Sequence, residues 1–193
     1  MGDMPARHDD AILRICFVCT GNICRSPMAE VIFRDMVDEA GLADAVYITS
    51  AGTGEWHVGE KADPRTRAAL DRVGYSAENH RAKQFEVSWF ETFDLIVTFD
   101  RGQRRILRAW ARDDDERALI RPLLSFSPAD PGSPSGEVPD PYYGSDELFD
   151  RVRDMIEVAC RGLLAQIEPV VRAAQQGRRA SAVRHDPPSQ EPS

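Results

Sequence analysis

The sequence predicts an α/β fold in which helices cover both faces of a four-stranded parallel sheet. Two observations carry this prediction. Short apolar segments rich in β-branched residues alternate along the chain with longer segments whose apolar residues recur every three or four positions. Such alternation of strand and helix is typical of parallel sheets. Because these sheets bind ligands beyond the carboxyl ends of their strands, functional residues are expected in the segments that follow the strands.

Four short strands are expected. The segment ILRICFV at 12–18 is apolar and β-branched, as a buried strand should be. The segments AVYITS at 45–50 and DLIVT at 94–98 predict the second and third strands. The fourth, RALIRPLL at 117–124, has the weakest pattern.

Four helices are expected between and after these strands. In the first, the apolar residues from Ala29 to Ala40 fall on one helical face. Ser26 can cap its N-terminus, Pro27 suits the first helical position and Gly41 suits the C-terminal stop. The others are expected at 64–74, near 100–112 and near 145–170.

The length of 193 residues fits one domain with tails. The polar segment 1–11 is expected to be flexible, and the folded domain to cover 12–171. The segment 172–193 contains three prolines and no aromatic residue, so it is predicted to be a disordered tail.

Composition excludes several classes of protein. A net charge of −8 argues against a general nucleic-acid binder, which needs a basic face. No apolar stretch approaches the roughly 18 residues of a membrane span, and the N-terminus lacks the apolar core of a signal peptide. Four cysteines in a chain of this length do not suggest a disulfide framework. We expect the protein to reside in a reducing cytoplasm. Export by a route that needs no signal peptide stays open as an alternative.

The segment CTGNICR at 19–25 lies between the first strand and the first helix. Gly21 and Asn22 tolerate left-handed backbone angles, so the loop can curl and turn successive N–H groups inward. The helix adds its positive end, and Arg25 can hold two phosphate oxygens in a fork. The loop therefore predicts a phosphate site, formed by Thr20, Gly21, Asn22, Ile23, Cys24 and Ser26.

Cys19 is the first residue of this loop. A ring of N–H donors and a helix N-terminus favour the thiolate, the nucleophilic form of cysteine, and Ser26 can donate its hydroxyl to the sulfur. Phosphoryl transfer to sulfur suits such a site, although phosphate binding without chemistry stays open. A zinc or redox pair of Cys16 and Cys19 is disfavoured, because their spacing turns them to opposite faces of one strand. Cys16 and Cys160 are expected in the core.

The stretch VCTGNICRSP at 18–27 resembles the signature of the low-molecular-weight protein tyrosine phosphatases. The resemblance implies a flavodoxin-like three-layer sandwich and a phosphocysteine intermediate on Cys19, with Arg25 binding the phosphoryl oxygens. It also implies that Asn22 holds the loop backbone, with help from Ser50 and His80. Cys24 resembles the second cysteine of the family, which forms a reversible disulfide with the nucleophile; a buried spectator thiol is the alternative.

The reaction needs a proton donor for the leaving oxygen, and DPYYG at 140–144 offers Asp140. Pro141 stiffens this segment. An ordinary Asp-Pro turn is the alternative, but the segment resembles the part of the family signature that carries the general acid, which later activates water. Pro139 departs from that pattern, since an acidic residue is expected there.

Aromatic residues are expected to wall the pocket. Trp56 and His57 in SAGTGEWHVG, together with Tyr142 and Tyr143, would form a slot for a phenyl ring. We interpret His57 as a wall residue rather than a catalytic base. The segments TGEWHVG and GYSAENHRAKQ resemble the mycobacterial PtpA-type branch of the family.

A metal-independent protein-tyrosine phosphatase without cofactor is the expected function. A thiol-dependent arsenate reductase would need two further cysteines, which 70–110 lacks. A protein arginine phosphatase would carry threonine where this chain has Ile23, and a phosphotyrosine reader would be expected to lose Cys19, Arg25 or Asp140. Phosphotyrosine proteins are the expected partners, with a cognate tyrosine kinase left open. A monomer without nucleic-acid or membrane partners is expected.

Overall fold

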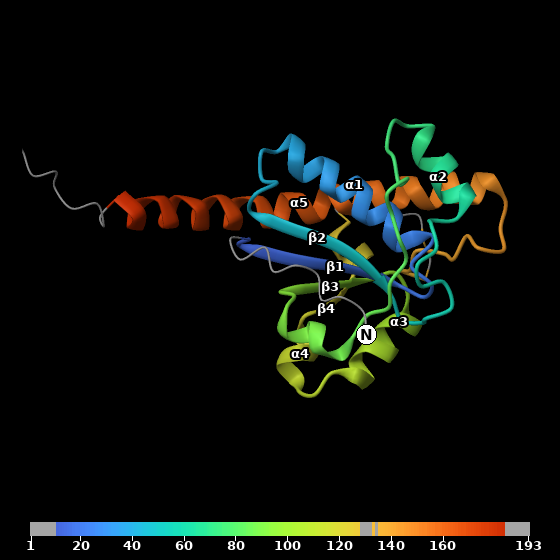
Figure 1. Ribbon diagram of the computed structural model, residues 1–193, viewed down its shortest axis with the longest axis horizontal. Helices are drawn as coiled ribbons and strands as arrows, with labels where there is room; N and C mark the ends of the chain where they lie inside the picture. Colours follow the sequence, from blue (N-terminus) through green and yellow to red (C-terminus); the bar gives the residue numbers. More distant parts are fainter. Residues whose placement is uncertain (1–10, 128–132, 134, 184–193) are drawn as a thin grey trace, which may run out of the picture.

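A parallel four-stranded sheet forms the centre of the computed structural model, which describes residues 11–127, 133 and 135–183. The strands are β1 (Leu13–Cys19), β2 (Val46–Gly52), β3 (Leu95–Thr98) and β4 (Ile120–Pro122). Their order in the sheet is β2-β1-β3-β4, and every neighbouring pair is parallel (Figure 1). The predicted α/β class and the four-stranded parallel sheet are confirmed.

The strand register brings the ends of β1, β2 and β3 to one edge of the sheet. Cys19, the last residue of β1, pairs with Gly52, the last residue of β2. Val18 pairs with Thr98 at the end of β3. The segments that follow these three strands therefore begin side by side at this edge of the sheet. The candidate catalytic and binding residues lie at the same edge.

Helices cover both faces of the sheet, which makes three layers (Figure 1). One face carries α1 (Arg25–Glu39) and α5 (Asp146–Val183), with α2 (Pro64–Asp71) packed against α5. The other carries α3 (Arg101–Trp110) and the short α4 (Asp114–Ala118). Two 3₁₀ turns, η1 (Val87–Glu91) and η2 (Leu123–Phe126), complete the elements of the described residues.

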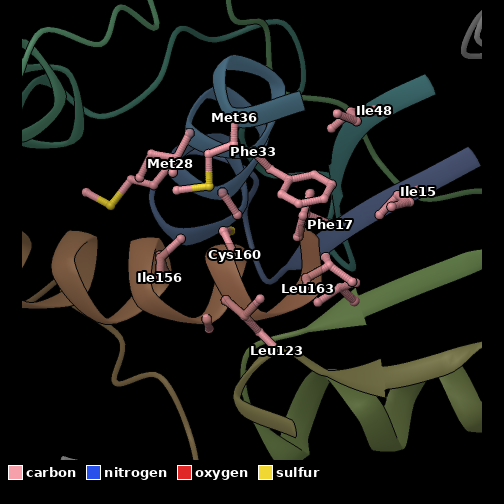
Figure 2. Packing of buried hydrophobic residues seen from close by; sticks show 14 of the residues in the cluster. Ile15, Phe17, Met28, Phe33, Met36, Ile48, Leu123, Ile156, Cys160 and Leu163 are labelled. Carbon is pink, nitrogen blue, oxygen red and sulfur yellow. The ribbon is translucent and has the colours of Figure 1, made fainter. Parts of the chain in front are cut away.

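The alternation of side chains along β1 divides the core in two. Ile15, Phe17 and Cys19 face the larger cluster beneath α1 and α5, where Phe17 packs edge-on against Phe33 with ring centres 5.7 Å apart (Figure 2). Cys16 and Val18 face the second cluster, which is rich in aromatic residues. The expectation that Cys16 and Cys19 lie on opposite faces is confirmed. So is the core position of Cys160, on α5 (Figure 2).

The segment 117–124 differs from the expected strand. Only Ile120–Pro122 pairs with β3, and residues 114–118 form helix α4. Asp113 caps this helix by accepting a hydrogen bond from the Glu116 N–H, and three acidic residues fill the first turn. A capped acidic first turn favours a helix start over a longer strand.

The last helix is longer than expected. It continues to Val183, so the prediction of disorder from 172 onward is wrong for 172–183, while 184–193 and the segment 1–10 lie outside the described residues. Alanine, arginine and glutamine dominate 172–180, and these are strong helix formers. Arg172 also anchors the helix by donating to the Ala40 carbonyl oxygen. Within the described part of the chain, no helix is long and apolar enough to cross a membrane.

Candidate active site

The loop from Cys19 to Arg25, called the phosphate loop below, connects β1 to α1. Asn22 adopts a left-handed conformation with φ of 57°, as its residue type allows. The loop lies against β2 at Gly52, where an added Cβ would be 2.7 Å from the Thr20 carbonyl oxygen. A glycine at this position is therefore needed for the loop to curl so close to the sheet.

The carbonyl oxygens of the phosphate loop point outward, because four of them accept hydrogen bonds from neighbouring segments. The bonds run from Thr53 N to Cys19 O (2.9 Å), Gly54 N to Thr20 O (2.9 Å), His80 Nε2 to Asn22 O (2.7 Å) and Asp63 N to Ile23 O (2.9 Å). In a trans peptide the N–H of the next residue points the opposite way. The N–H groups of Thr20, Gly21, Ile23 and Cys24 therefore face the inside of the loop, as a nest for an anion requires.

Asn22 supports the loop from behind with its side chain. Its amide donates to Ser26 Oγ and to Ser50 Oγ, both at 2.8 Å, and its oxygen accepts from the Lys83 N–H at 2.9 Å. Asn22 and Ser26 are fully buried and do not belong to the pocket wall. Both side chains therefore act beneath the loop.

Glu30 anchors this support and was missed by the sequence analysis. It accepts hydrogen bonds from Ser50 and Arg34, and its carboxylate lies 3.9 Å from His80 Nδ1. The pKa of His80 is lowered, chiefly because burial disfavours the charged ring. A neutral ring can donate from Nε2 to the Asn22 carbonyl oxygen. Glu30 lies one helical turn after Ser26 on α1, which is the only sequence signal for it.

Cys19 lies buried at the floor of the loop, with its Sγ 3.0 Å from Ser26 Oγ. Ser26 was expected to cap α1, but the helix begins at Arg25 and has no side-chain cap. The Ser26 hydroxyl instead accepts from Asn22 and contacts the sulfur. Competition from these tertiary partners outweighs its intrinsic preference for the cap position.

The other three cysteines differ from Cys19 in their surroundings. Burial raises the pKa of Cys24 to about 12, with a smaller contribution from nearby negative groups including Cys19. Burial also raises the pKa of Cys16 and of Cys160 well above the ordinary thiol value. These three side chains are therefore neutral thiols near pH 7.

Arg25 joins three segments through its guanidinium group. Nη1 donates to Asp100 Oδ2 at 2.8 Å and to the Val138 carbonyl oxygen at 3.1 Å, while Nη2 donates to Asp140 Oδ2 at 3.0 Å. Its side chain is only 3% exposed. Nε is buried and has no hydrogen-bond partner among the described residues. A buried donor without a partner is costly, and an anion in the pocket would satisfy it.

Asp100 is a second site residue that the sequence analysis missed. It caps α3 by accepting from the Gln103 N–H at 2.9 Å, and it also accepts from the Gln103 side chain at 2.7 Å. Gln103 in turn donates to Thr20 Oγ1 at 3.2 Å. Asp100 follows β3 at the same sheet edge as Cys19, which is the signal that could have revealed it.

The segment from Asp140 to Gly144, called the acid loop below, covers one side of the pocket. It follows Val138, whose N–H donates to the Phe99 carbonyl oxygen at 2.9 Å. The Asp140 side chain is 52% exposed, and its Oδ1 accepts from the Tyr142 N–H at 3.2 Å. The carboxylate therefore lies between Arg25 and open solvent, where a leaving group or a water molecule can reach it.

A pocket of about 180 Å³ opens above the phosphate loop and brings most of the predicted residues together. The lining residues are Cys19, Thr20, Gly21, Ile23, Cys24, Arg25, Trp56, His57, Asp140, Tyr142 and Tyr143. Ser50 and His80 lie behind the loop, as the family resemblance implied. One end of the pocket is thus lined by backbone donors and the other by aromatic rings.

The aromatic wall is exposed where a substrate would enter. Trp56 is 71% exposed and Tyr143 is 96% exposed, so neither contributes to the core. The rings of Tyr142 and Tyr143 meet edge-on at 4.9 Å, and the His57 ring lies 6.3 Å from that of Tyr142. His57 Nδ1 is 2.8 Å from Glu60 Oε2, which orients the ring as a wall.

Metal ligands are not gathered here: among the described residues, no group of three or more histidine, cysteine, aspartate or glutamate side chains could hold a metal ion. The groups of the pocket that suit this chemistry are its inward N–H donors, the Arg25 guanidinium, the Cys19 thiol and the Asp140 carboxylate, which is the only carboxylate among the described residues of the lining. Together they can bind a phosphoryl group, attack it with sulfur and protonate the oxygen that leaves.

Comparisons with known proteins agree with this chemistry. The family model described as low molecular weight phosphotyrosine protein phosphatase matches residues 14–173. A low molecular weight protein-tyrosine-phosphatase from Streptomyces coelicolor is 51% identical over 158 residues, which cover 82% of this chain and 95% of the relative. The low molecular weight protein-tyrosine phosphatase A of Mycobacterium tuberculosis is 46% identical over 151 residues, covering 78% and 89%.

A solved structure confirms the fold assignment. The crystal structure of YfkJ from Bacillus subtilis has a TM-score of 0.75 and 36% sequence identity, and the match covers 82% of this chain and 96% of that chain. The chain belongs to the low molecular weight phosphotyrosine protein phosphatase family.

Proposed function

We propose that this chain hydrolyses phosphotyrosine in proteins through a phosphocysteine on Cys19, with Arg25 binding the phosphoryl oxygens and Asp140 as general acid and base. The convergence of these three side chains on one pocket carries the proposal. Family membership supplies the phosphatase activity and the phosphocysteine mechanism. The assignment of each role to a residue of this chain rests on the contacts described above.

In the first step, the Cys19 thiolate attacks phosphorus and forms the S–P bond. The P–O bond to the tyrosyl oxygen breaks, its electron pair goes to that oxygen, and Asp140 supplies the proton. The inward N–H groups and Arg25 stabilise the charge on the equatorial oxygens. Because the phosphate competes with Asp140 for the Arg25 fork, substrate binding also releases the carboxyl group to act as an acid.

In the second step, water attacks phosphorus and the S–P bond breaks. The Asp140 carboxylate takes one proton from this water, and the electron pair of the S–P bond returns to sulfur. Inorganic phosphate leaves, and the thiolate and the protonated carboxyl are restored. Ser26 Oγ, 3.0 Å from the sulfur, can donate a hydrogen bond to the departing thiolate.

The shape of the pocket supports an aryl phosphate as substrate. Ile23 lines the pocket with an apolar surface, and Trp56, Tyr142 and Tyr143 flank its mouth. A phenyl ring buries apolar area against such walls, whereas the charged, hydrogen-bonding guanidinium of phosphoarginine would lose hydration there. Phosphotyrosine is therefore favoured over phosphoarginine.

Three finer assignments belong to the proposal. A place in the mycobacterial PtpA-type branch is supported by 46% identity to the M. tuberculosis enzyme, although the S. coelicolor relative is more similar. A monomeric enzyme is supported by a pocket that residues of one chain line, and a cytoplasmic location by four cysteines that are all free thiols. Its partners would be phosphotyrosine proteins and the kinase that makes them.

Phosphate release from a phosphotyrosine peptide tests the proposal, with wild-type and Cys19→Ser protein measured side by side in EDTA. We expect release by the wild type and none by Cys19→Ser, because a serine hydroxyl is a far weaker nucleophile than a thiolate. Circular dichroism establishes that the variant is folded. Activity of Cys19→Ser within tenfold of the wild type would contradict the mechanism. Release from a phosphoarginine peptide alone would contradict the substrate class.

A further inference from the structure

The acid loop is held to the rest of the molecule by two arginines, of which Arg25 belongs to the phosphate site. The other is Arg65, in the first turn of α2. Arg65 Nη2 donates to the Tyr142 carbonyl oxygen at 2.9 Å, and Nη1 donates to the Gly144 carbonyl oxygen at 3.3 Å. Arg65 does not line the pocket itself, although its guanidinium carbon lies 5.9 Å from the centre of the Tyr142 ring, which does.

Arg65 is itself rigidly placed. Its guanidinium group donates two hydrogen bonds to the carboxylate of Asp63, the N-cap of α2. They run from Nε to Oδ1 at 3.1 Å and from Nη2 to Oδ2 at 3.0 Å. The guanidinium carbon lies 4.5 Å from the centre of the Phe149 ring on α5, within cation–π range. Burial tends to raise the pKa of Asp63, but the bonds from Arg65 outweigh it and lower the pKa. The pair is therefore charged near neutral pH.

The same pair reaches the phosphate loop. The Asp63 N–H donates to the Ile23 carbonyl oxygen at 2.9 Å, which is one of the bonds that turn the loop carbonyls outward. Asp63 and Arg65 thus connect the loop that holds the nucleophile to the loop that holds the acid. The path runs through two residues of one helix N-terminus and does not pass through the pocket.

The connection ends on the acid itself. Arg65 holds Tyr142 by its carbonyl oxygen, and the N–H on the other side of the same residue donates to Asp140 Oδ1 at 3.2 Å. Because Asp140 is half exposed, few other contacts define where its carboxyl group lies. Arg25 cannot be the only constraint, since a bound phosphate competes for its fork.

We propose that Arg65 is a positioning residue for the general acid: by holding the Tyr142 and Gly144 carbonyl oxygens, it keeps Asp140 within reach of the leaving oxygen. The inference rests on the proposed function of Asp140. Arg65 touches neither phosphate nor the reacting atoms, so its loss acts on proton transfer and leaves phosphate binding in place.

The test compares Arg65→Gln with the wild type on two substrates. One is a phosphotyrosine peptide, whose leaving phenol has a pKa near 10 and needs a proton. The other is an aryl phosphate whose leaving phenol is strongly acidic and needs none. We expect kcat/KM for the peptide to fall about 10- to 100-fold, the scale of a misplaced catalytic group, and kcat/KM for the second substrate to fall much less.

Two further variants on the same helix sharpen the readout. Arg67→Gln is the matched control, because Arg67 pairs with Glu78 and does not contact the acid loop. It should keep the wild-type rates on both substrates. Arg65→Lys retains a charge that can reach one carbonyl oxygen, so we expect partial recovery relative to Arg65→Gln. Equal losses on both substrates in Arg65→Gln would show a merely structural role and overturn the proposal.

A double variant separates this inference from the proposed function. If Arg65 acts through Asp140, Arg65→Gln should cause no further loss in an Asp140→Ala background. A full additional loss there would overturn the positioning role. If Asp140→Ala alone shows no preference for the acidic leaving group, the role of Asp140 fails. If Asp140→Ala shows that preference and Arg65→Gln does not, only the role of Arg65 fails.

Discussion

The phosphate loop and the acid loop meet at one pocket but are held in different ways. The phosphate loop is buried except at Thr20 and Gly21, and its carbonyl oxygens and the Asn22 side chain bind several segments at once. The acid loop is exposed, with Tyr143 96% accessible, and is held mainly by Arg25, Arg65 and the anchor at Val138.

The contrast matches the two tasks. A nest for an anion stabilises charge only if its donors are already in place, because reorganising them during the reaction would cost free energy. A proton donor must instead admit a substrate, give up its proton and then admit water. A loop fixed by a few side chains allows this movement, whereas a loop fixed by its own backbone does not.

The largest expected effect comes from the residue that both loops share. Arg25→Lys replaces a fork by a point charge, which cannot bond two phosphate oxygens at once while it keeps the contact with Asp100. We expect kcat/KM for a phosphotyrosine peptide to fall by about 10²- to 10³-fold or more. The exposed Arg101→Lys is the control. A loss below tenfold in Arg25→Lys would remove Arg25 from phosphate binding.

A pair of substitutions compares the rigidity of the two loops directly. Asn22→Ala removes three buried hydrogen bonds at a left-handed position, so we expect the free energy of unfolding to fall by about 2–3 kcal/mol. Tyr143→Ala alters an exposed ring and should change it by no more than about 0.5 kcal/mol. Urea unfolding measures both values, and similar losses would mean that the loops do not differ in this way.

The same contrast explains how much of the site could be predicted from the sequence. Cys19, Asn22 and Arg25 lie within seven residues between a strand and a helix, so local rules predict their loop. Asp140 was found only through its motif. Three residues of the site were missed because their roles depend on partners that are distant in the sequence: Asp100, Arg65 and Glu30. Asp100, for example, is 75 residues from its partner Arg25.

Two errors of the sequence analysis have a physical cause. Ser26 has the residue type of a helix cap, yet its partners in the fold are Asn22 and Cys19, and tertiary contacts decided its role. The segment 172–193 was predicted to be disordered because it contains three prolines and no aromatic residue, but all three prolines lie after Val183, and the residues before them extend a helix that is already formed. Extending a helix avoids the cost of nucleation.

Alkylation compares the reactivity of the two cysteines within the phosphate loop. Cys19 and Cys24 are five residues apart, but burial raises the pKa of Cys24 to about 12, and Cys16 and Cys160 are buried thiols too. Near pH 7, iodoacetate should therefore label Cys19 alone, and inorganic phosphate should slow the labelling. Peptide mass mapping identifies the site, and Cys19→Ser provides the unlabelled control. Label at Cys24 in the native protein would contradict the assignment of reactivity.

The smallest expected effect is a pH dependence of stability that arises beneath the phosphate loop. Burial lowers the pKa of His80 in the folded chain below its ordinary value of 6.5, so the unfolded chain binds the proton more readily. The free energy of unfolding should therefore be highest above pH 6.5 and fall as the pH drops through that value toward the folded pKa. His80→Gln can still donate to the Asn22 carbonyl oxygen but cannot take up this proton. Its urea unfolding free energy should consequently depend less steeply on pH between about 7 and 5, and an unchanged slope would mean that another group beneath the loop carries the titration.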